Sequence, residues 1–229
     1  MEIINLKDSK TVSDNSAQLC AEHQITDIKQ AIKNENRVNI FVDGEYEFSL
    51  DIVQLVDFKL KVGLKLSDED LAKYKKASEF GKVYQRALEW VLTRPRSVRE
   101  TKDYLKKKQR ERDIDDADIE KILQKLLDKK YLNDYEFAKY FVENRFVNKG
   151  ISKKRLRIEL IKKGINSTTI DEVLNADIRN DEEEIKKIIM KKQKRYDAAQ
   201  MINYLARQGF EFELARNLVQ DFYEMDLQN

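Results

Sequence analysis

Apolar residues recur with a helical period along most of the chain, from about Val83 onward. They return every three or four positions, which is the spacing of one face of an α-helix. Residues that end helices interrupt the pattern at intervals, namely Pro95, Gly150, Gly164 and Gly209. The pattern therefore predicts a series of short amphipathic helices separated by tight turns.

The predicted helices form three groups of three, each with the same order of apolar stripes and breaks. A pattern that returns about every 45 to 55 residues is typical of a helical array, in which each repeat buries its apolar face on its neighbour. We therefore expect a mostly α fold of three tandem three-helix repeats, at 83–132, 133–178 and 179–229, that form an elongated curved body.

The residues before the array alternate between apolar and polar positions, as β-strands do. The segments 37–42 and 46–50 flank Asp43-Gly44, a dipeptide that is typical of a type I′ hairpin turn. Residues 25–28 could add a third strand. We expect a small N-terminal domain of a β-hairpin and a short helix at 25–66.

Other boundaries follow from polarity and from capping residues. The expected segments are a flexible, polar tail at 1–24, a short helix at 51–60 and the start of a linking helix at 67–82. Ser97 and Glu100 have the spacing of a capping box, which would open the second helix of the first repeat.

The composition narrows the possible chemistry. The chain has 229 residues, a formal net charge of +2, one cysteine, Cys20, and one histidine, His23. A disulfide framework or a Cys/His metal site needs more of these residues, so we expect no metal and no cofactor. We find no glycine-rich phosphate loop and no nucleophile paired with a base, so we expect a binding protein without catalytic residues.

Positive charge is concentrated where the first and second helices of each repeat meet. The candidate binding residues are Arg94, Arg96, Lys102 and Lys106, then Arg145, Lys149, Lys153, Lys154, Arg155, Arg157 and Lys162, then Lys187, Lys191, Lys194, Arg195 and Arg207. Stacked repeats place equivalent positions along one edge, so these clusters are expected to merge into a basic stripe. Such a stripe suits phosphate or an acidic protein surface. The alternative is that the charges serve solubility alone.

The aromatic residues allow two interpretations. Phe137, Phe141 and Phe146 could stack on bases, but they lie on an apolar helical stripe and are better explained as core. Tyr140 and Tyr196 fit the stripe less well and could contact a ligand.

The sequence contains no pattern typical of a membrane span or of a secretion signal. No apolar run approaches the roughly 18 residues of a membrane span. Met1 is followed by Glu2 rather than by a basic segment and an apolar segment. We therefore expect a cytoplasmic protein, a monomer, with no membrane partner.

Three stretches resemble the RecX family of recombinase regulators. They are 87–97 with Glu100 and Leu105, 131–165 with its Tyr-Leu-Asn-Asp and Lys-Gly motifs, and 204–210. The hairpin 39–49 is similar to the N-terminal region of longer members, so the resemblance covers about 25–222. Lys130 departs from the pattern, because a glycine usually precedes the Tyr-Leu-Asn-Asp stretch.

The resemblance implies a protein that binds the filament of RecA on DNA, along its groove. Family members usually inhibit RecA by limiting its ATPase, strand exchange and co-protease activity, and many bind single- and double-stranded DNA. The resemblance thus implies a role in recombination, DNA repair and the SOS response. Two other functions remain open, a stand-alone DNA-binding array and a helical adaptor for an acidic protein.

Overall fold

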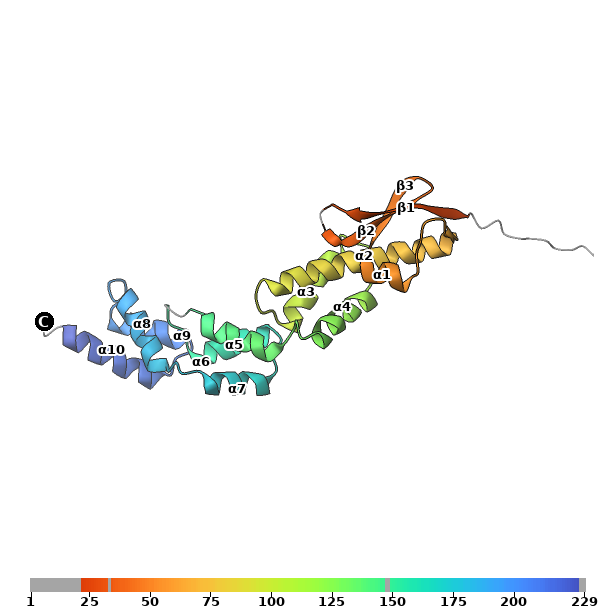
Figure 1. Cartoon of the computed structure of the whole chain (residues 1–229). Helices are drawn as coiled ribbons and strands as arrows, with labels where there is room; N and C mark the ends of the chain where they lie inside the picture. The colour runs from red at the N-terminus through yellow and green to blue at the C-terminus, as the bar shows by residue number, and fades with distance from the viewer. Residues whose placement is uncertain (1–21, 33, 147–148, 227–229) are drawn as a thin grey trace, which may run out of the picture. The chain divides into compact units, whose positions relative to one another are not determined.

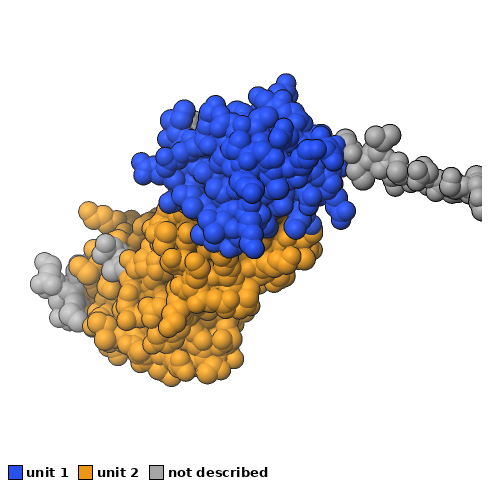
Figure 2. Space-filling view, turned by 45° about the vertical axis from the view of Figure 1, so that its right-hand side comes forward, with its two compact units in different colours: residues 1–78 blue, residues 79–229 orange. Residues whose placement is uncertain are grey.

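The computed structural model describes residues 22–32, 34–146 and 149–226, and the chain divides into two compact units (Figure 2). Unit 1 is Met1–Ser78 and unit 2 is Glu79–Asn229. The boundary lies inside one continuous helix, α2 (Asp68–Leu92), so this helix contributes residues to both units. The predicted class, mostly α with a small N-terminal sheet, is confirmed (Figure 1).

Unit 1 contains a four-stranded antiparallel sheet in the order β3-β2-β1-β4. Its strands are β1 (His23–Ala31), β2 (Asn34–Val42), β3 (Glu45–Asp51) and β4 (Lys65–Leu66). The predicted hairpin turn is confirmed, since Asp43 and Gly44 both have positive φ, 51° and 90°. The possible third strand is present as β1, which begins within the segment expected to be a tail.

The core of unit 1 lies between this sheet and two helices. Ile25, Ile40 and Leu50 are fully buried on the sheet. Tyr74 of α2 packs its ring 6.1 Å from that of Phe48. The short helix α1 (Ile52–Asp57) begins at a capping box and is shorter than the expected 51–60.

His23 of β1 contacts the β2–β3 turn and the start of α2, which its position in the sequence did not indicate. Its Nδ1 lies 2.9 Å from a carboxylate oxygen of Asp43, and its Nε2 lies 3.0 Å from one of Asp68. The hydrogen bonds to Asp43 and Asp68 raise the pKa of His23. Cys20 lies outside the described residues.

Unit 2 is helical throughout its described part. After α2 come α3 (Val98–Gln109), α4 (Asp116–Asp128), α5 (Asp134–Asn144), α6 (Lys153–Lys162), α7 (Ser167–Ala176), α8 (Asp181–Lys192), α9 (Ala198–Arg207) and α10 (Phe212–Asp226). The buried residues form three separate clusters. They belong to the second part of α2 with α3 and α4, to α5–α7, and to α8–α10. We call these three-helix groups repeats 1, 2 and 3.

The helix starts are set by side chains that accept backbone N–H groups. Ser97 caps α3 by accepting from Glu100 N at 3.0 Å. The expected capping box is nevertheless incomplete, because the Glu100 carboxylate pairs with Lys163 Nζ at 2.5 Å and Arg94 Nη1 at 3.4 Å. Glu100 is therefore used for contacts beyond its own helix start.

The structure shows which turn forms at Lys130, the position where family members usually have a glycine. It has φ 59°, in the left-handed region, directly after the end of α4. Its N–H donates to Leu127 O at 2.8 Å, and Tyr131 N–H donates to Leu126 O at 2.9 Å. This is a Schellman turn, in which glycine is normally preferred.

We predict that Lys130→Gly stabilises unit 2 by about 0.5–1 kcal/mol. A side chain in the left-handed region costs roughly 1–2 kcal/mol, and the added freedom of glycine in the unfolded chain offsets part of the gain. Lys129→Gly is the matched control, because Lys129 has φ −83° and gains nothing from glycine. Urea unfolding should show the first variant more stable and the second less stable than the parent. A less stable Lys130→Gly would contradict the prediction.

Candidate functional site

A joint of defined chemistry connects repeat 1 to repeat 2. The hydroxyl of Ser97, which is fully buried, donates to Lys163 O at 2.9 Å at the end of α6. The neighbouring Val98 N–H donates to Asp134 Oδ1 at 2.9 Å at the start of α5. One hydroxyl thus caps its own helix and also binds the end of a helix in the next repeat. We call this arrangement joint 1–2.

The same arrangement connects repeat 2 to repeat 3. Ser152 caps α6 and donates its hydroxyl to Gln208 O at 2.8 Å at the end of α9. Lys153 N–H donates to Asp181 Oδ1 at 3.1 Å at the start of α8. We call this arrangement joint 2–3. Equivalent hydrogen bonds therefore form between repeats 1 and 2 and between repeats 2 and 3.

A glycine at each joint allows the end of one helix to approach the start of another closely. Gly164 and Gly209 follow α6 and α9 with φ 83° and 92°. A Cβ on Gly164 would lie 2.8 Å from Arg99 Cβ, and one on Gly209 would lie 2.9 Å from Ser152 Oγ. The expected left-handed conformation is confirmed, and the packing adds a second reason for glycine.

A third glycine brings the loop before α6 onto α8. Gly150 has φ 78°, and a Cβ there would lie 2.5 Å from Glu184 O and 2.6 Å from Ile188 Cγ1. The next residue, Ile151, donates its N–H to Glu184 Oε2 at 3.0 Å. Because Glu184 is 1% exposed, this carboxylate is a buried part of joint 2–3.

The carboxyl groups at the joints have pKa values shifted in opposite directions by burial and by neighbouring charges. Burial raises the pKa of Asp134 and of Asp181, and it outweighs the bonds from the backbone N–H groups. Burial also raises the pKa of Glu100, but the bonds and charges of Lys163 and Arg94 outweigh it and lower that pKa overall. Glu100 is therefore a stable anion that links repeat 1 to repeat 2.

Many of the candidate cations gather around joint 2–3. Three neighbouring hollows share lining residues. Two lie at joint 2–3 and have volumes of about 420 and 410 Å³, and the third is lined by repeat 2 alone and reaches Lys163 of joint 1–2. Their cationic lining, which we call the joint 2–3 cluster, is Arg145, Lys149, Lys154, Arg155, Lys162, Lys163, Lys191, Lys192 and Arg207. Lys154, Lys162 and Arg207 are exposed to solvent.

Within the cluster, Arg145 and Arg155 pair with Glu159 of the same repeat, at 2.7 and 3.4 Å. Other candidate cations are also held within their own repeats. In repeat 1, Lys102 Nζ lies 2.5 Å from Glu120 and Lys106 Nζ lies 3.7 Å from Asp116, both at the start of α4. In repeats 2 and 3, Arg157 pairs with Asp171, Lys153 Nζ donates to Leu174 O, and Lys187 pairs with Glu184. Four of these side chains pair with carboxylates, and Lys153 binds backbone carbonyl groups at the end of α7.

The remaining candidates lie apart from that cluster. Arg94 pairs with Glu100, and the Arg96 guanidinium lies 3.9 Å from the centre of the Trp90 ring. Trp90 in turn stacks on Tyr104, with ring centres 4.5 Å apart. Lys194 and Arg195 are exposed after α8, with Arg195 beside Tyr196. A single stripe along all three repeats therefore stays a prediction.

The aromatic residues divide between core and surface. Phe137 is 1% exposed, as expected of a core residue, and Phe141 packs partly buried against the same core. Phe146 packs there too, but it also lines the larger hollow at joint 2–3. Tyr196, which was expected to be less committed to the core, stacks on Tyr204 at 5.4 Å between ring centres.

Lys192 lies in the same basic run as the candidates Lys187, Lys191 and Lys194, but neither Lys192 nor Tyr204 is among the candidate binding residues. Tyr204 lines the same hollow as Phe146, and Lys192 Nζ lies 4.8 Å from the Tyr204 ring centre. A signal was present, since Tyr204 and Tyr104 both lie seven positions after their N-caps, Asp197 and Ser97.

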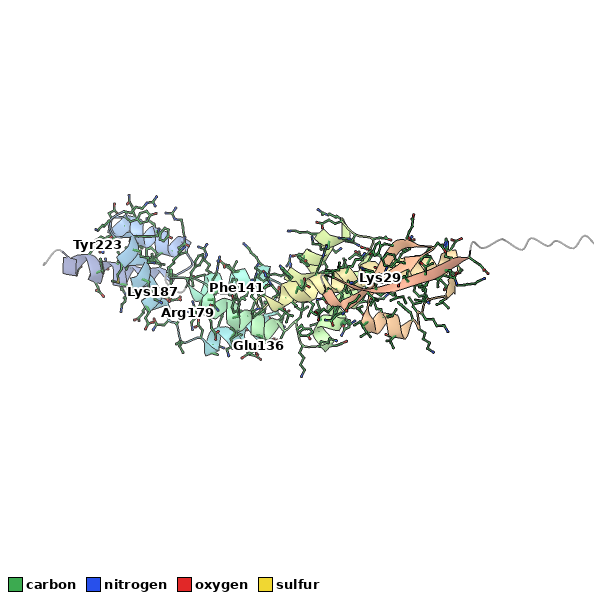
Figure 3. The ribbon with its side chains drawn as sticks, turned by 45° about the horizontal axis from the view of Figure 1, so that its top comes forward. Lys29, Glu136, Phe141, Arg179, Lys187 and Tyr223 are labelled. Carbon is green, nitrogen blue, oxygen red and sulfur yellow. The ribbon has the colours of Figure 1, made fainter. Side chains whose placement is uncertain are left out.

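Arg179 is another residue that sequence reasoning missed. It lies between α7 and α8 (Figure 3). It donates to Arg145 O at 3.1 Å and to Val142 O at the end of α5. Its guanidinium also pairs with Asp177 at 3.2 Å. Arg179 thus holds the end of α5, and with it Arg145, in place beside joint 2–3.

Neither a metal site nor a membrane span is found in the described part of the chain. Within residues 22–32, 34–146 and 149–226, no three His, Cys, Asp or Glu side chains are grouped to hold an ion. None of the described helices combines the length and hydropathy that a membrane crossing requires.

Comparison with known proteins identifies the family. The chain is 36% identical over 198 residues to the regulatory protein RecX of Bacillus subtilis (strain 168), and the match covers 83% of this chain and 74% of that protein. The chain belongs to the RecX family. A regulatory protein RecX from Listeria monocytogenes (serovar 1/2a) is 31% identical, with 84% and 73% of the two chains covered.

Two RecX domain models match defined parts of the chain, and one solved RecX structure has the same fold. The RecX N-terminal domain matches residues 23–67, which include the sheet of unit 1, and the second three-helix domain of RecX matches residues 133–174, in repeat 2. A crystal structure of regulatory protein RecX has the same fold, with a TM-score of 0.66 at 24% identity. The structural match covers 87% of this chain and 99% of the chain in that crystal structure. The chain is thus a RecX-family regulatory protein.

Proposed function

We propose that the protein regulates the RecA recombinase, most directly as an inhibitor, by binding the RecA filament on DNA. It would lie in the filament groove and limit ATP hydrolysis, strand exchange and co-protease activity. Membership of the RecX family carries this proposal, because the family resemblance implies that partner. The protein would act by binding alone.

The joints support this mode of action. Each joint fixes the spacing of neighbouring repeats through a buried serine, a carboxylate and a glycine. An array with defined spacing can contact equivalent positions on successive subunits of a helical filament. The joint 2–3 cluster places exposed Lys154, Lys162 and Arg207 on one surface, where phosphate or an acidic filament surface would be attracted.

The direct test is ATP hydrolysis by RecA on single-stranded DNA in the presence of the protein. The wild-type protein is expected to lower the rate. The double variant Lys154→Glu with Arg207→Glu should need roughly tenfold more protein for the same effect, because two attractive contacts become repulsive. The matched control is Lys61→Glu with Lys129→Glu, which changes the net charge equally at exposed positions outside the cluster.

The outcomes separate the alternatives. Unchanged hydrolysis at saturating wild-type protein would contradict the proposal. If hydrolysis is unchanged but bare DNA is bound with a steep dependence on salt, the protein is a stand-alone DNA-binding array. If neither is observed, the adaptor for an acidic protein remains.

A further inference from the structure

The larger hollow at joint 2–3 has the features of a ligand site. Its volume of about 420 Å³ lies within the range of small-molecule pockets. Its walls come from the loop between α5 and α6, from the start of α6, and from α8 and α9 of repeat 3. The lining residues that carry its chemistry are Phe146, Lys149, Arg155, Lys191, Lys192 and Tyr204. No carboxylate is among its described lining residues.

The cationic and aromatic groups of this hollow are close to one another. Lys149 Nζ lies 5.8 Å from the Phe146 ring centre, and Lys192 Nζ lies 4.8 Å from the Tyr204 ring centre. Within the described residues, neither Lys149 nor Lys192 is paired with a carboxylate. Their charge is therefore compensated only by the aromatic rings and by solvent, and it remains available to an anion.

Rigid contacts define the rest of the hollow. Arg155 donates to the Gln208 side chain across the joint, and Gly150 lies directly on α8. Tyr204 is held from one side by its stack on Tyr196. Ile151 and Ile188, both buried, supply apolar surface. The hollow thus exists before a ligand arrives, which lowers the cost of ordering side chains on binding.

We propose that this hollow binds one nucleotide unit, with its base against Phe146 and Tyr204 and its phosphate on Lys149 and Lys192. Aromatic rings beside unpaired ammonium groups match the two halves of a nucleotide, a π-face and an anion. One face of Phe146 already lies 3.9 Å from the Arg145 guanidinium and one face of Tyr204 stacks on Tyr196, so the base would contact the remaining face or edge of each ring. A base paired in a duplex is not free to enter, so the source is an unpaired nucleotide of a single strand or a free nucleoside phosphate. The choice of a strand as ligand rests on the proposed contact with the RecA–DNA filament.

The test uses the full-length protein without RecA, so that its failure leaves the ATPase result intact. Fluorescence anisotropy would compare a fluorescein-labelled decamer of thymidines with an abasic decamer of equal charge. The wild-type protein should bind the thymidine decamer about tenfold more tightly, because base–aromatic stacking adds to the phosphate contacts. Phe146→Leu and Tyr204→Leu should each reduce that preference several-fold. Tyr131→Leu, an exposed tyrosine of repeat 1, should leave it unchanged.

Lys149→Gln provides a variant that keeps the fold, because Lys149 is exposed. It should weaken both decamers several-fold. An excess of dATP identifies the source: displacement of the decamer indicates a free-nucleotide site, and no displacement indicates a strand site. Equal binding of the thymidine and abasic decamers by wild type would overturn the proposal. So would an unchanged preference in both aromatic variants, or no binding of any probe.

Discussion

Gly150→Ala is expected to destabilise unit 2 by roughly 3 kcal/mol. About 1–2 kcal/mol comes from placing a side chain in the left-handed region, where Gly150 has φ 78°. The new Cβ would also lie 2.5 Å from the backbone oxygen of Glu184. Backbone in a helix cannot move aside as a flexible side chain can, so the overlap adds about 1–3 kcal/mol. The loop should then lift from α8.

Gly63→Ala separates these two contributions. Gly63 has φ 87°, but a Cβ there would meet nothing within 4 Å. This variant should cost only the conformational part, about 1–2 kcal/mol, and only in unit 1. Amide hydrogen exchange would report each unit separately, with faster exchange expected in α8 for Gly150→Ala. The prediction fails if Gly150→Ala costs no more than Gly63→Ala.

Ser152→Ala is expected to destabilise unit 2 by about 2–3 kcal/mol. The hydroxyl of Ser152 has two roles, since it accepts from Arg155 N at 3.2 Å and donates to Gln208 O at 2.8 Å. Losing an N-cap costs about 1 kcal/mol. Leaving the carbonyl oxygen without its donor in a buried joint costs about another 1–2 kcal/mol. Ser97→Ala should behave similarly, because Ser97 has the same two roles at joint 1–2.

Asn166→Ala is the matched control for the serine variants. Asn166 caps α7 by accepting from Thr169 N at 2.8 Å, and its side chain is exposed. Its loss should cost about 1 kcal/mol, the capping part alone. Urea unfolding of the three variants gives the comparison. Equal costs for Ser152→Ala and Asn166→Ala would show that the hydroxyl bond to Gln208 contributes nothing.

Local patterns predicted the helices well because short-range rules determine them. The apolar stripes, the cap at Ser97 and the glycines at 164 and 209 all act within about six residues of their own position. The hairpin at Asp43-Gly44 is equally local. The joints are different, because the Ser97 hydroxyl reaches the carbonyl of Lys163, 66 positions away. No periodicity encodes such a pairing until the helices are placed in space.

The same limit applies to the charges of the candidate site. Lys102 and Lys106 are candidate binding residues because their near neighbours in the sequence are mostly basic. Their acidic partners, Glu120 and Asp116, lie on the next helix and become close only when α3 packs on α4. Charge counting along the chain therefore overestimates free positive charge wherever an acidic helix start folds back onto a basic helix.

The N-cap of α9 has a consequence for self-association. Asp197 occupies the position that Ser97 and Ser152 hold in the other repeats, and its carboxylate accepts from Gln200 N at 2.8 Å. An ionised carboxylate has no hydrogen to donate, so it cannot bind a carbonyl as the serines do. At the other end, α3 ends at Arg110, which is right-handed, with no glycine after it. Neither end of the array therefore carries the groups that form its half of a joint, and we expect that copies of the protein do not join head to tail through this contact.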